Sequence, residues 1–268
     1  MAKSKIFMSS IPLTRRRIVS DIFGFKEGTF PKTYLGIPLI QGRVTKQAII
    51  PLIEKILKRA NIWTGSMISF QGRVTLAKFV LNSIPIHNMV IYKWPRSLIK
   101  GGDNIIRNYI WTGDPTKRKG VTLKWEKVCE PVNEGGLGVR SLGEVNNAML
   151  CKLHWVFKQN TEEWAKFLKS KFSSKSGDPI RYHKPSTIWK GIQTGAALLK
   201  PHIGWLIENG TQIDFRRDTW ETNIPIMEYI DLPRQLWKNY APKLSNFINP
   251  QGWNVPNDIR LLLLALGI

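Results

Sequence analysis

The sequence predicts a mainly α-helical protein with minor β structure. Apolar residues recur at three- and four-residue spacing in most segments, as on one face of a helix, whereas other apolar runs are few and short. A hydrophobic share of 43% in 268 residues is enough for a folded core. We expect a basic helical domain over residues 1–175, followed by a smaller mixed α/β region over residues 176–268 that contains a β-hairpin.

The N-terminal part is expected to combine short extended segments with basic helices. A brief apolar run near residues 6–9 and a segment over residues 34–39, bounded by Gly and Pro, predict strands. Helices are predicted over residues 15–22 and 45–61. Pro51 fits only the first turn of a helix, so the regular part of the second helix is expected to begin there.

Helical spacing continues through the middle of the chain. The pattern of apolar residues predicts helices over residues 72–83, 97–111, 141–159 and 161–172. The last of these helices starts at a plausible N-cap, Thr161.

Breaks and turns dominate the last third of the chain. Residues 175–185 are rich in Ser, Gly and Pro and predict a linker. Asn209-Gly210 lies between apolar runs at 205–207 and 212–215, which is the pattern of a β-hairpin. The apolar run at 261–266 is too short to span a bilayer. It stops close to the end of the chain, so we expect this region to be truncated at its C-terminal end.

The charge balance predicts a polyanionic partner. Forty Lys and Arg face nineteen Asp and Glu, a formal net charge of +21, and most of the excess lies in the first 120 residues. Such an excess repels itself in a compact fold, which favours a partner such as nucleic acid. A solvated basic surface is the alternative. A membrane partner is not expected, because no basic helix carries a clean apolar face of Trp, Phe and Leu.

Basic side chains are predicted to hold the phosphates of RNA, DNA or an RNA–DNA hybrid, which fixes position without reading sequence. The eleven tryptophans are expected mostly to pack inside the fold, although exposed ones would stack on bases. The arginine triplet at residues 15–17 and the basic run at residues 117–119 are also compatible with nuclear import signals. The nucleic-acid-binding candidates are Arg15, Arg16, Arg17, Lys46, Lys55, Lys58, Arg59, Arg73, Lys78, Lys117, Arg118 and Lys119.

No catalytic residue, metal site or cofactor is predicted. Nucleotidyl transfer and ribonuclease H chemistry need clustered carboxylates that hold two metal ions, whereas no two aspartates are adjacent in this sequence. Cys151 and His154 have zinc-ligand spacing, and Cys129 and His183 could complete four ligands, but no second closely spaced pair exists. The aspartates considered as metal ligands are Asp103, Asp114, Asp214, Asp218 and Asp231.

The two cysteines do not form a disulfide framework, and the N-terminus lacks the apolar stretch of a secretory signal. A nuclear or cytoplasmic location, without secretion or a transmembrane segment, is therefore expected.

Several segments, taken in order, resemble the region that follows the palm in plant LINE-type, non-LTR retrotransposon reverse transcriptases. Residues 3–9 resemble the stretch beyond that family's polymerase carboxylates. Residues 31–39 contain its YLG-x-PL element, and residues 57–85 are similar to its helical thumb-like stretch. The later blocks that agree in the same order are Ile110-Trp111-Thr112-Gly113, Trp125 with Cys129, the segment 135–142 followed by Asn146-Asn147-Ala148, Ser186-Thr187-Ile188-Trp189, and the segment 209–220.

The resemblance implies a thumb and connection segment without either catalytic flank. In that family the Tyr-x-Asp-Asp type carboxylates lie before the region matched here, and the ribonuclease-H-like region lies after it. The chain is then expected to bind nucleic acid and not to be active alone. Two other interpretations stay open: the chain is part of a longer RNA-directed DNA polymerase, or it is a decayed element with no selected function.

Overall fold

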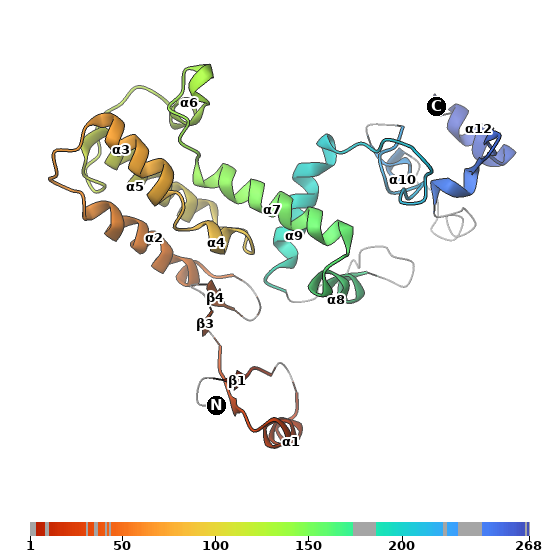
Figure 1. The fold of residues 1–268 in the computed structure, drawn as a ribbon, viewed down its shortest axis with the longest axis horizontal. Coiled ribbons are helices and arrows are strands. Elements are labelled where there is room, and N and C mark those ends of the chain that lie inside the picture. Colours follow the sequence, from red (N-terminus) through yellow and green to blue (C-terminus); the bar gives the residue numbers. More distant parts are fainter. Residues whose placement is uncertain are drawn as a thin grey trace. The chain divides into compact units, whose positions relative to one another are not determined.

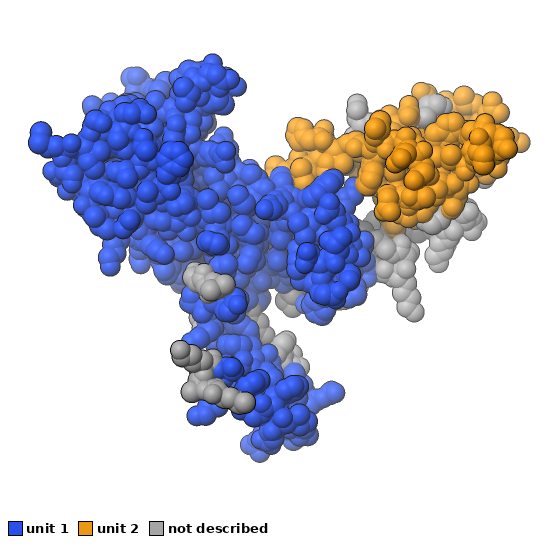
Figure 2. All heavy atoms as spheres, viewed as in Figure 1, with its two compact units in different colours: residues 1–195 blue, residues 196–268 orange. Residues whose placement is uncertain are grey.

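The computed structural model describes residues 4–8, 11–30, 32–34, 37–40, 42, 44–173, 186–221, 224–229, 243–265 and 267. Within them the protein is mostly helical and holds three two-stranded sheets (Figure 1), which confirms the predicted mainly α fold with minor β structure. The chain divides into two compact units, residues 1–195 and 196–268 (Figure 2). The predicted linker over 175–185 lies outside the described residues, as does the predicted domain boundary.

A β–α–β element opens the described chain. Strand β1 (Lys5–Ile6) pairs in parallel with β2 (Lys26–Glu27), and helix α1 (Leu13–Phe23) connects the two strands. The rings of Phe7 and Phe30 pack together, with 5.0 Å between their centroids. No residue of α1 is buried, so this helix contributes exposed surface rather than core.

The second predicted strand is in fact part of a β-hairpin. The sequence predicted one extended segment over residues 34–39, whereas β3 (Lys32–Tyr34) and β4 (Ile37–Leu39) pair with each other in antiparallel fashion. The residues between these two strands lie outside the described part of the chain. The hydroxyl of Tyr92 donates a 3.0 Å hydrogen bond to the carbonyl oxygen of Pro38, which ties the hairpin to the helical body.

Four helices form the body of unit 1: α2 (Lys46–Asn61), α3 (Phe70–Leu76), α5 (Arg96–Thr112) and α7 (Leu142–Gln159). Helices α2, α3 and α7 each pack against α5 (Figure 1). Their apolar faces meet in one core, and its burial is the main favourable contribution to the stability of this unit. The buried core side chains include Ile49, Ile56, Leu81, Ile106, Tyr109, Ile110 and Leu142.

Helix α2 differs from the prediction at Pro51. The helix is continuous from Lys46 and contains Pro51, whereas the sequence predicted that its regular part would begin at this proline. Proline cannot donate to the carbonyl four residues earlier. Both Pro51 and Gln47 are exposed, so water can bond to that carbonyl. Thr45 has the extended backbone of an N-cap, but its side chain makes no capping hydrogen bond.

Helix α3 begins earlier than predicted and changes its winding near its end. The hydroxyl oxygen of Ser69 accepts a 3.2 Å hydrogen bond from the amide of Gly72, so the helix starts before residue 72. It continues as a π-helical turn, η1 (Ala77–Leu81), and α4 (Ile86–Met89) follows.

A buried carboxamide joins α7 to the segment between α4 and α5. The Oδ1 atom of Asn146 accepts a 3.0 Å hydrogen bond from the amide of Trp94. Its Nδ2 donates to the carbonyl oxygens of Met89 and Tyr92, at 3.1 and 2.9 Å. Leaving buried polar groups unpaired is costly, so these bonds fix the path of the chain into α5.

The glycine-rich segment over residues 135–138 forms a tight turn. A short helix, α6 (Trp125–Cys129), and a 3-10 turn, η2 (Val132–Glu134), precede it. A Cβ atom on Gly136 would lie 2.0 Å from the carbonyl oxygen of Glu130. Only glycine therefore fits this close approach.

Two further helices, α8 (Glu163–Phe172) and α9 (Trp189–Leu199), form a second buried cluster with the end of α7. The rings of Phe172 and Trp189 are stacked, with centroids 4.3 Å apart and planes within 6°. The predicted N-cap at Thr161 is wrong by one position, and no side-chain hydrogen bond caps α8.

Unit 2 surrounds a smaller apolar core with short elements. They are η3 (Lys200–His202), α10 (Ile226–Tyr229), η4 (Leu244–Phe247), β5 (Ile248–Asn249), β6 (Gly252–Trp253) and α12 (Asn257–Ala265). Strands β5 and β6 form an antiparallel hairpin, so this mixed region does contain the predicted type of element. The buried side chains are Ile213, Phe215, Trp220, Ile226, Leu244, Phe247 and Ile259.

The position predicted for this hairpin, around Asn209-Gly210, is wrong. A turn does form there, because Oδ1 of Asn209 accepts a hydrogen bond from the amide two residues later and Gly210 has a φ of 67°. Its flanks bond to a distant segment instead of to each other. The amide of Leu244 donates to the carbonyl of Ile213 at 3.0 Å, and the amide of Ser245 donates to that of Gly210 at 3.1 Å.

Gly195→Ala is expected to destabilise unit 1. The added Cβ atom would lie 2.2 Å from the carbonyl oxygen of Leu150 in α7, so α9 would have to move away, at a cost of about 1–3 kcal/mol. Gly101→Ala on α5 is the matched control. Its Cβ atom would meet nothing within 4 Å, and alanine favours a helix over glycine by about 0.5–1 kcal/mol. Urea unfolding should move the two midpoints in opposite directions; a wild-type midpoint for Gly195→Ala would contradict the close packing.

Candidate nucleic-acid interface

The structure describes all twelve predicted binding residues and places them in five regions. The arginine triplet lies on α1, and four of the others lie along α2. Arg73 belongs to α3 and Lys78 to η1. Lys117, Arg118 and Lys119 lie in the loop after α5, and all three are exposed.

Within the triplet, Arg16 is already engaged inside the N-terminal element. Its Nη1 atom forms a 2.9 Å ion pair with Glu27, and its Nε donates to the carbonyl oxygen of Ile11 at 3.0 Å. Arg15 and Arg17 are exposed. The triplet therefore offers two free-standing guanidinium groups, whereas the third fastens α1 to β2.

Lys55, Lys58 and Arg59 share the exposed side of α2, away from its buried residues. The guanidinium carbon of Arg59 lies 5.3 Å from the ring centroid of Trp63. A stacked guanidinium loses less freedom on binding than a free one. Arg59 is therefore preoriented, whereas Lys46 stands apart at the first turn of α2.

The ends of α2, α3 and α5 meet at an aromatic junction. The rings of Trp63 and Tyr109 lie 6.0 Å apart, and those of Phe70 and Trp111 lie 5.3 Å apart. Arg73 lies over Phe70, with its guanidinium carbon 5.9 Å from the ring centroid.

Arg73 also approaches the C-terminal end of α5. A Cβ atom on Gly113 would lie 3.3 Å from Nη1 of Arg73. The negative end of the α5 dipole favours a cation there. We call Arg59, Arg73 and the loop residues Lys117, Arg118 and Lys119 the basic corner.

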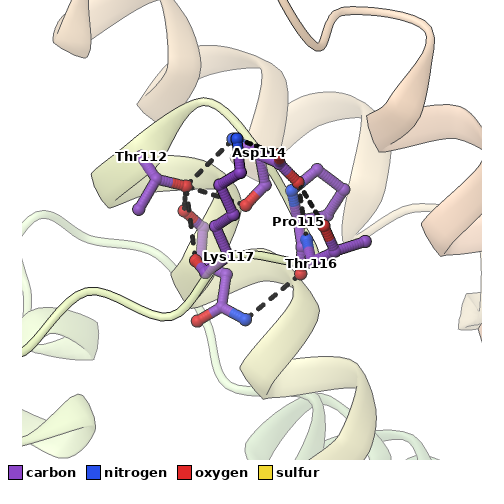
Figure 3. Close-up of polar contacts among 6 residues, drawn as sticks. Thr112, Asp114, Pro115, Thr116 and Lys117 are labelled. Atoms are coloured by element: carbon purple, nitrogen blue, oxygen red, sulfur yellow. Dashed lines mark hydrogen bonds and ion pairs between the residues drawn. The ribbon is translucent and has the colours of Figure 1, made fainter.

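The loop of the basic corner begins from an ordered turn, shown in Figure 3. The hydroxyl of Thr112 lies 2.7 Å from the carbonyl oxygen of Asp114 and accepts the amide of Asp114 at 2.9 Å. Oδ1 of Asp114 accepts both the amide and the hydroxyl of Thr116, at 2.9 and 2.6 Å. The side chain of Asn108 donates to the carbonyl of Pro115 at 3.1 Å. The base of this loop is thus held to α5.

The return of the loop is held as well. Nη2 of Arg107, on α5, donates to the carbonyl oxygens of Val121 and Leu123, at 3.3 and 3.2 Å. Lys117 lies 3.4 Å from Oδ2 of Asp114, whose pKa is lowered by the hydrogen bonds from Thr116. Lys117 is therefore partly neutralised, which leaves Arg118 and Lys119 as the stronger anion-binding groups of the loop.

Lys78 lies apart from the basic corner, at the other end of the α3–η1 helix. A Cβ atom on Gly138 would lie 3.3 Å from its Nζ atom. Sequence reasoning did not identify Phe70 as part of the site. The signal was present, because Phe70 and Arg73 are three residues apart and Arg59 and Trp63 are four apart, spacings that bring side chains together on a helix.

Among the residues that the structure describes, the groups considered for catalysis or metal binding do not form a cluster. The described residues contain no group of three or more His, Cys, Asp or Glu side chains that could hold a metal ion. Oδ2 of Asp218 accepts the amide of Asp214 at 2.8 Å, and Asp214 pairs with Arg217 at 3.0 Å. These two carboxylates therefore organise a turn. His183 and Asp231 lie outside the described residues.

Burial shifts the pKa of several groups that are not part of the basic corner. It raises the pKa of Asp103 to about 6, although the Leu142 amide, which donates to this carboxylate at 2.9 Å, lowers it. Burial and the nearby Asp103 raise the pKa of the Cys129 thiol to about 12. Burial also raises the pKa of Cys151 and lowers that of His154. These thiols and this imidazole are therefore uncharged near neutral pH.

None of the helices in the described ranges is long and apolar enough to cross a membrane.

Comparison with known proteins identifies two plant relatives. No protein-family model matches the chain. It is 32% identical over 243 residues to a "Putative ribonuclease H protein" of Arabidopsis thaliana, an alignment that covers 86% of this chain and 39% of the relative. It is 27% identical over 150 residues to an "Uncharacterized mitochondrial protein" of the same plant, covering 53% of this chain and 97% of that protein. The chain thus spans about two fifths of the first relative, and both relatives are plant proteins, as the resemblance implied.

Asp103→Asn is expected to remove a pH-dependent part of the stability. The folded-state pKa of about 6 exceeds the ordinary value of 3.8, so the folded protein binds this proton more tightly than the unfolded chain. The free energy of unfolding of the wild type therefore falls as the pH rises from about 4 to about 6. The expected fall is on the order of 1–2 kcal/mol, because the carboxylate keeps some contact with solvent. The Asp103→Asn variant keeps an oxygen that can accept the Leu142 amide, but its free energy of unfolding should not fall over this pH range.

Thermal unfolding from about pH 4 to about pH 7 checks this expectation. The variant should gain stability relative to the wild type as the pH rises and keep that gain at neutral pH. A difference between the two proteins that does not change with pH would refute the assignment.

Proposed function

We propose that the chain is a nucleic-acid-binding part of a retrotransposon-derived protein, which grips the backbone of RNA or of an RNA–DNA hybrid without catalysing a reaction itself. The observation that carries this proposal is the basic corner. Two guanidinium groups stacked on aromatic rings and a basic loop held at both of its ends gather where three helices meet.

The geometry of the basic corner suits phosphates. Guanidinium groups bind phosphate oxygens through paired N–H donors, and prior stacking reduces the entropy lost on binding. Lys55 and Lys58 extend the charged surface along α2, next to Arg59. Contacts of this kind fix position and do not read sequence. Arg15 and Arg17 offer a second basic surface on α1, whereas the contacts of Arg16 favour a structural role for it.

The relatives support a nucleic-acid ligand and a plant element. One of them is named as a ribonuclease H protein, and that name refers to an enzyme acting on RNA. Together with the resemblance to LINE-type reverse transcriptases, it favours RNA or an RNA–DNA hybrid as the partner and a thumb-like role for unit 1.

A second candidate function is a part in a longer RNA-directed DNA polymerase. The first relative is more than twice as long as the segment matched here, because the alignment covers 39% of it. In that case the same basic corner would hold the product duplex for a catalytic domain carried elsewhere in the polymerase.

The binding of a labelled 16-base-pair RNA–DNA hybrid, measured by fluorescence anisotropy between about 50 and 200 mM salt, tests the first candidate. If about five phosphates are neutralised, the logarithm of affinity should fall with the logarithm of salt with a slope of about −4 to −5. The triple variant Lys55→Glu, Lys58→Glu and Arg59→Glu should bind more weakly, and its slope should be smaller by about 3.

The matched control reverses the same number of charges elsewhere in unit 1. Lys152→Glu, Lys169→Glu and Lys190→Glu change exposed lysines of α7, α8 and α9, so the formal net charge of the protein changes by the same amount. Equal losses in the two triple variants would show that only net charge matters. The absence of binding at about 50 mM salt by a sample with helical circular dichroism would reject the proposed function.

A further inference from the structure

The loop between α2 and α3 presents an apolar surface to solvent. Met67 is fully exposed, at 106% of its reference area, and Ile62 is 59% exposed. Phe70, at the start of α3, is 37% exposed. We call these three side chains the apolar tip. Such side chains are costly to leave in water when they are gathered on one loop.

This exposure does not result from a lack of local structure. The amide of Ser66 donates to the carbonyl of Trp63 at 3.2 Å, and the amide of Ile68 donates to that of Ser66 at 2.7 Å. Gly65, with a φ of 80°, makes the tight bend. Ile68 is half-buried beside Gly72, where an added Cβ atom would lie 2.8 Å from its Cγ2. The side chain of Met67 is thus fully exposed to solvent although backbone hydrogen bonds hold the residues on either side of it.

Cations flank the apolar tip on both sides along the chain. Arg59 is stacked on Trp63 just before it, and Arg73 lies over Phe70 just after it. Phe70 packs in turn against Trp111, so the tip is continuous with the aromatic junction of the basic corner. Phe167 and Leu206, which are 65% and 96% exposed, lie outside the apolar tip.

We propose that the apolar tip stacks on unpaired nucleobases of a single-stranded segment of RNA or DNA, while Arg59 and Arg73 bind the phosphates on either side. This inference rests on the proposed function and adds a recognition step to it. Unpaired bases offer flat apolar faces between charged phosphates, which is the same alternation that the loop presents. The polarisable thioether of Met67 packs well on aromatic rings.

Paired nucleic acid fits this surface less well. In a duplex the faces of the bases are covered by their neighbours, and the phosphates form the outer surface. A duplex held by the basic corner alone would leave Ile62 and Met67 in water. The tip therefore favours a single strand, or the unpaired strand next to a duplex, over a fully paired ligand.

Two ligands with equal charge separate base stacking from phosphate binding. One is a 12-nucleotide DNA strand of mixed sequence, and the other is a strand of equal length that lacks every base. The wild-type chain should bind the first about tenfold more tightly. The variant Ile62→Ser with Met67→Ser should lose most of this preference, while its salt slope stays the same because the number of neutralised phosphates is unchanged.

Two control variants locate the effect. Phe167→Ser with Leu206→Ser removes two apolar side chains outside the tip that are 65% and 96% exposed, and this variant should keep the tenfold preference. Arg59→Gln should reduce the salt slope by about 1 and keep a preference for the strand with bases. Both tip positions are exposed, so circular dichroism should show unchanged folding for the serine variant.

Several results would overturn the inference while leaving the proposed function intact. One is equal affinity of the wild type for the two strands, and another is a serine variant that keeps the preference. A third is a serine variant that loses as much affinity for a blunt duplex as it loses for the single strand with bases. A fourth is a wild-type dimer that the serine substitutions dissociate without affecting binding, because the tip would then be an interface between copies. Failure to bind any nucleic acid would instead reject the proposed function.

Discussion

The carboxamide of Asn146 fixes the part of the molecule on which the basic corner depends. It is 2% exposed and bonds to three backbone groups between residues 89 and 94. Those residues lead directly into α5, so their position sets where α5 begins and how it runs between α2 and α7. The far end of α5 then carries the turn that starts the basic loop. One uncharged side chain in the core thus positions charged groups a whole helix away.

Periodic apolar patterns predicted the long helices well, because burial of one face decides their structure. The helix predicted over residues 97–111 is α5, which differs by one residue at each end. Local sequence patterns predicted structure less well where a segment distant in the sequence competed for the same backbone hydrogen bonds. The Asn209-Gly210 turn forms, but residues 243–245 take the backbone bonds that a hairpin would use. The π-turn at η1 has no counterpart in the apolar pattern, since its core residues fit an ordinary helix equally well.

The sequence predicted which kinds of residue form the candidate site, but not how the fold brings them together. A large excess of Lys and Arg indicated the kind of partner, and the basic residues of α2 could be placed on one helix side from their spacing. The meeting of Arg73 with the end of α5 could not be predicted, because it depends on how two helices pack. For the same reason Lys46 and Lys78, equal candidates in the sequence, lie away from the basic corner.

The ring stack between Phe172 and Trp189 has a consequence for how this chain tolerates change. It holds together the two ends of the stretch that runs from α8 to α9, at centroids 4.3 Å apart. Because both rings belong to the second buried cluster, the loss of either ring should weaken the packing of α8 and α9 together.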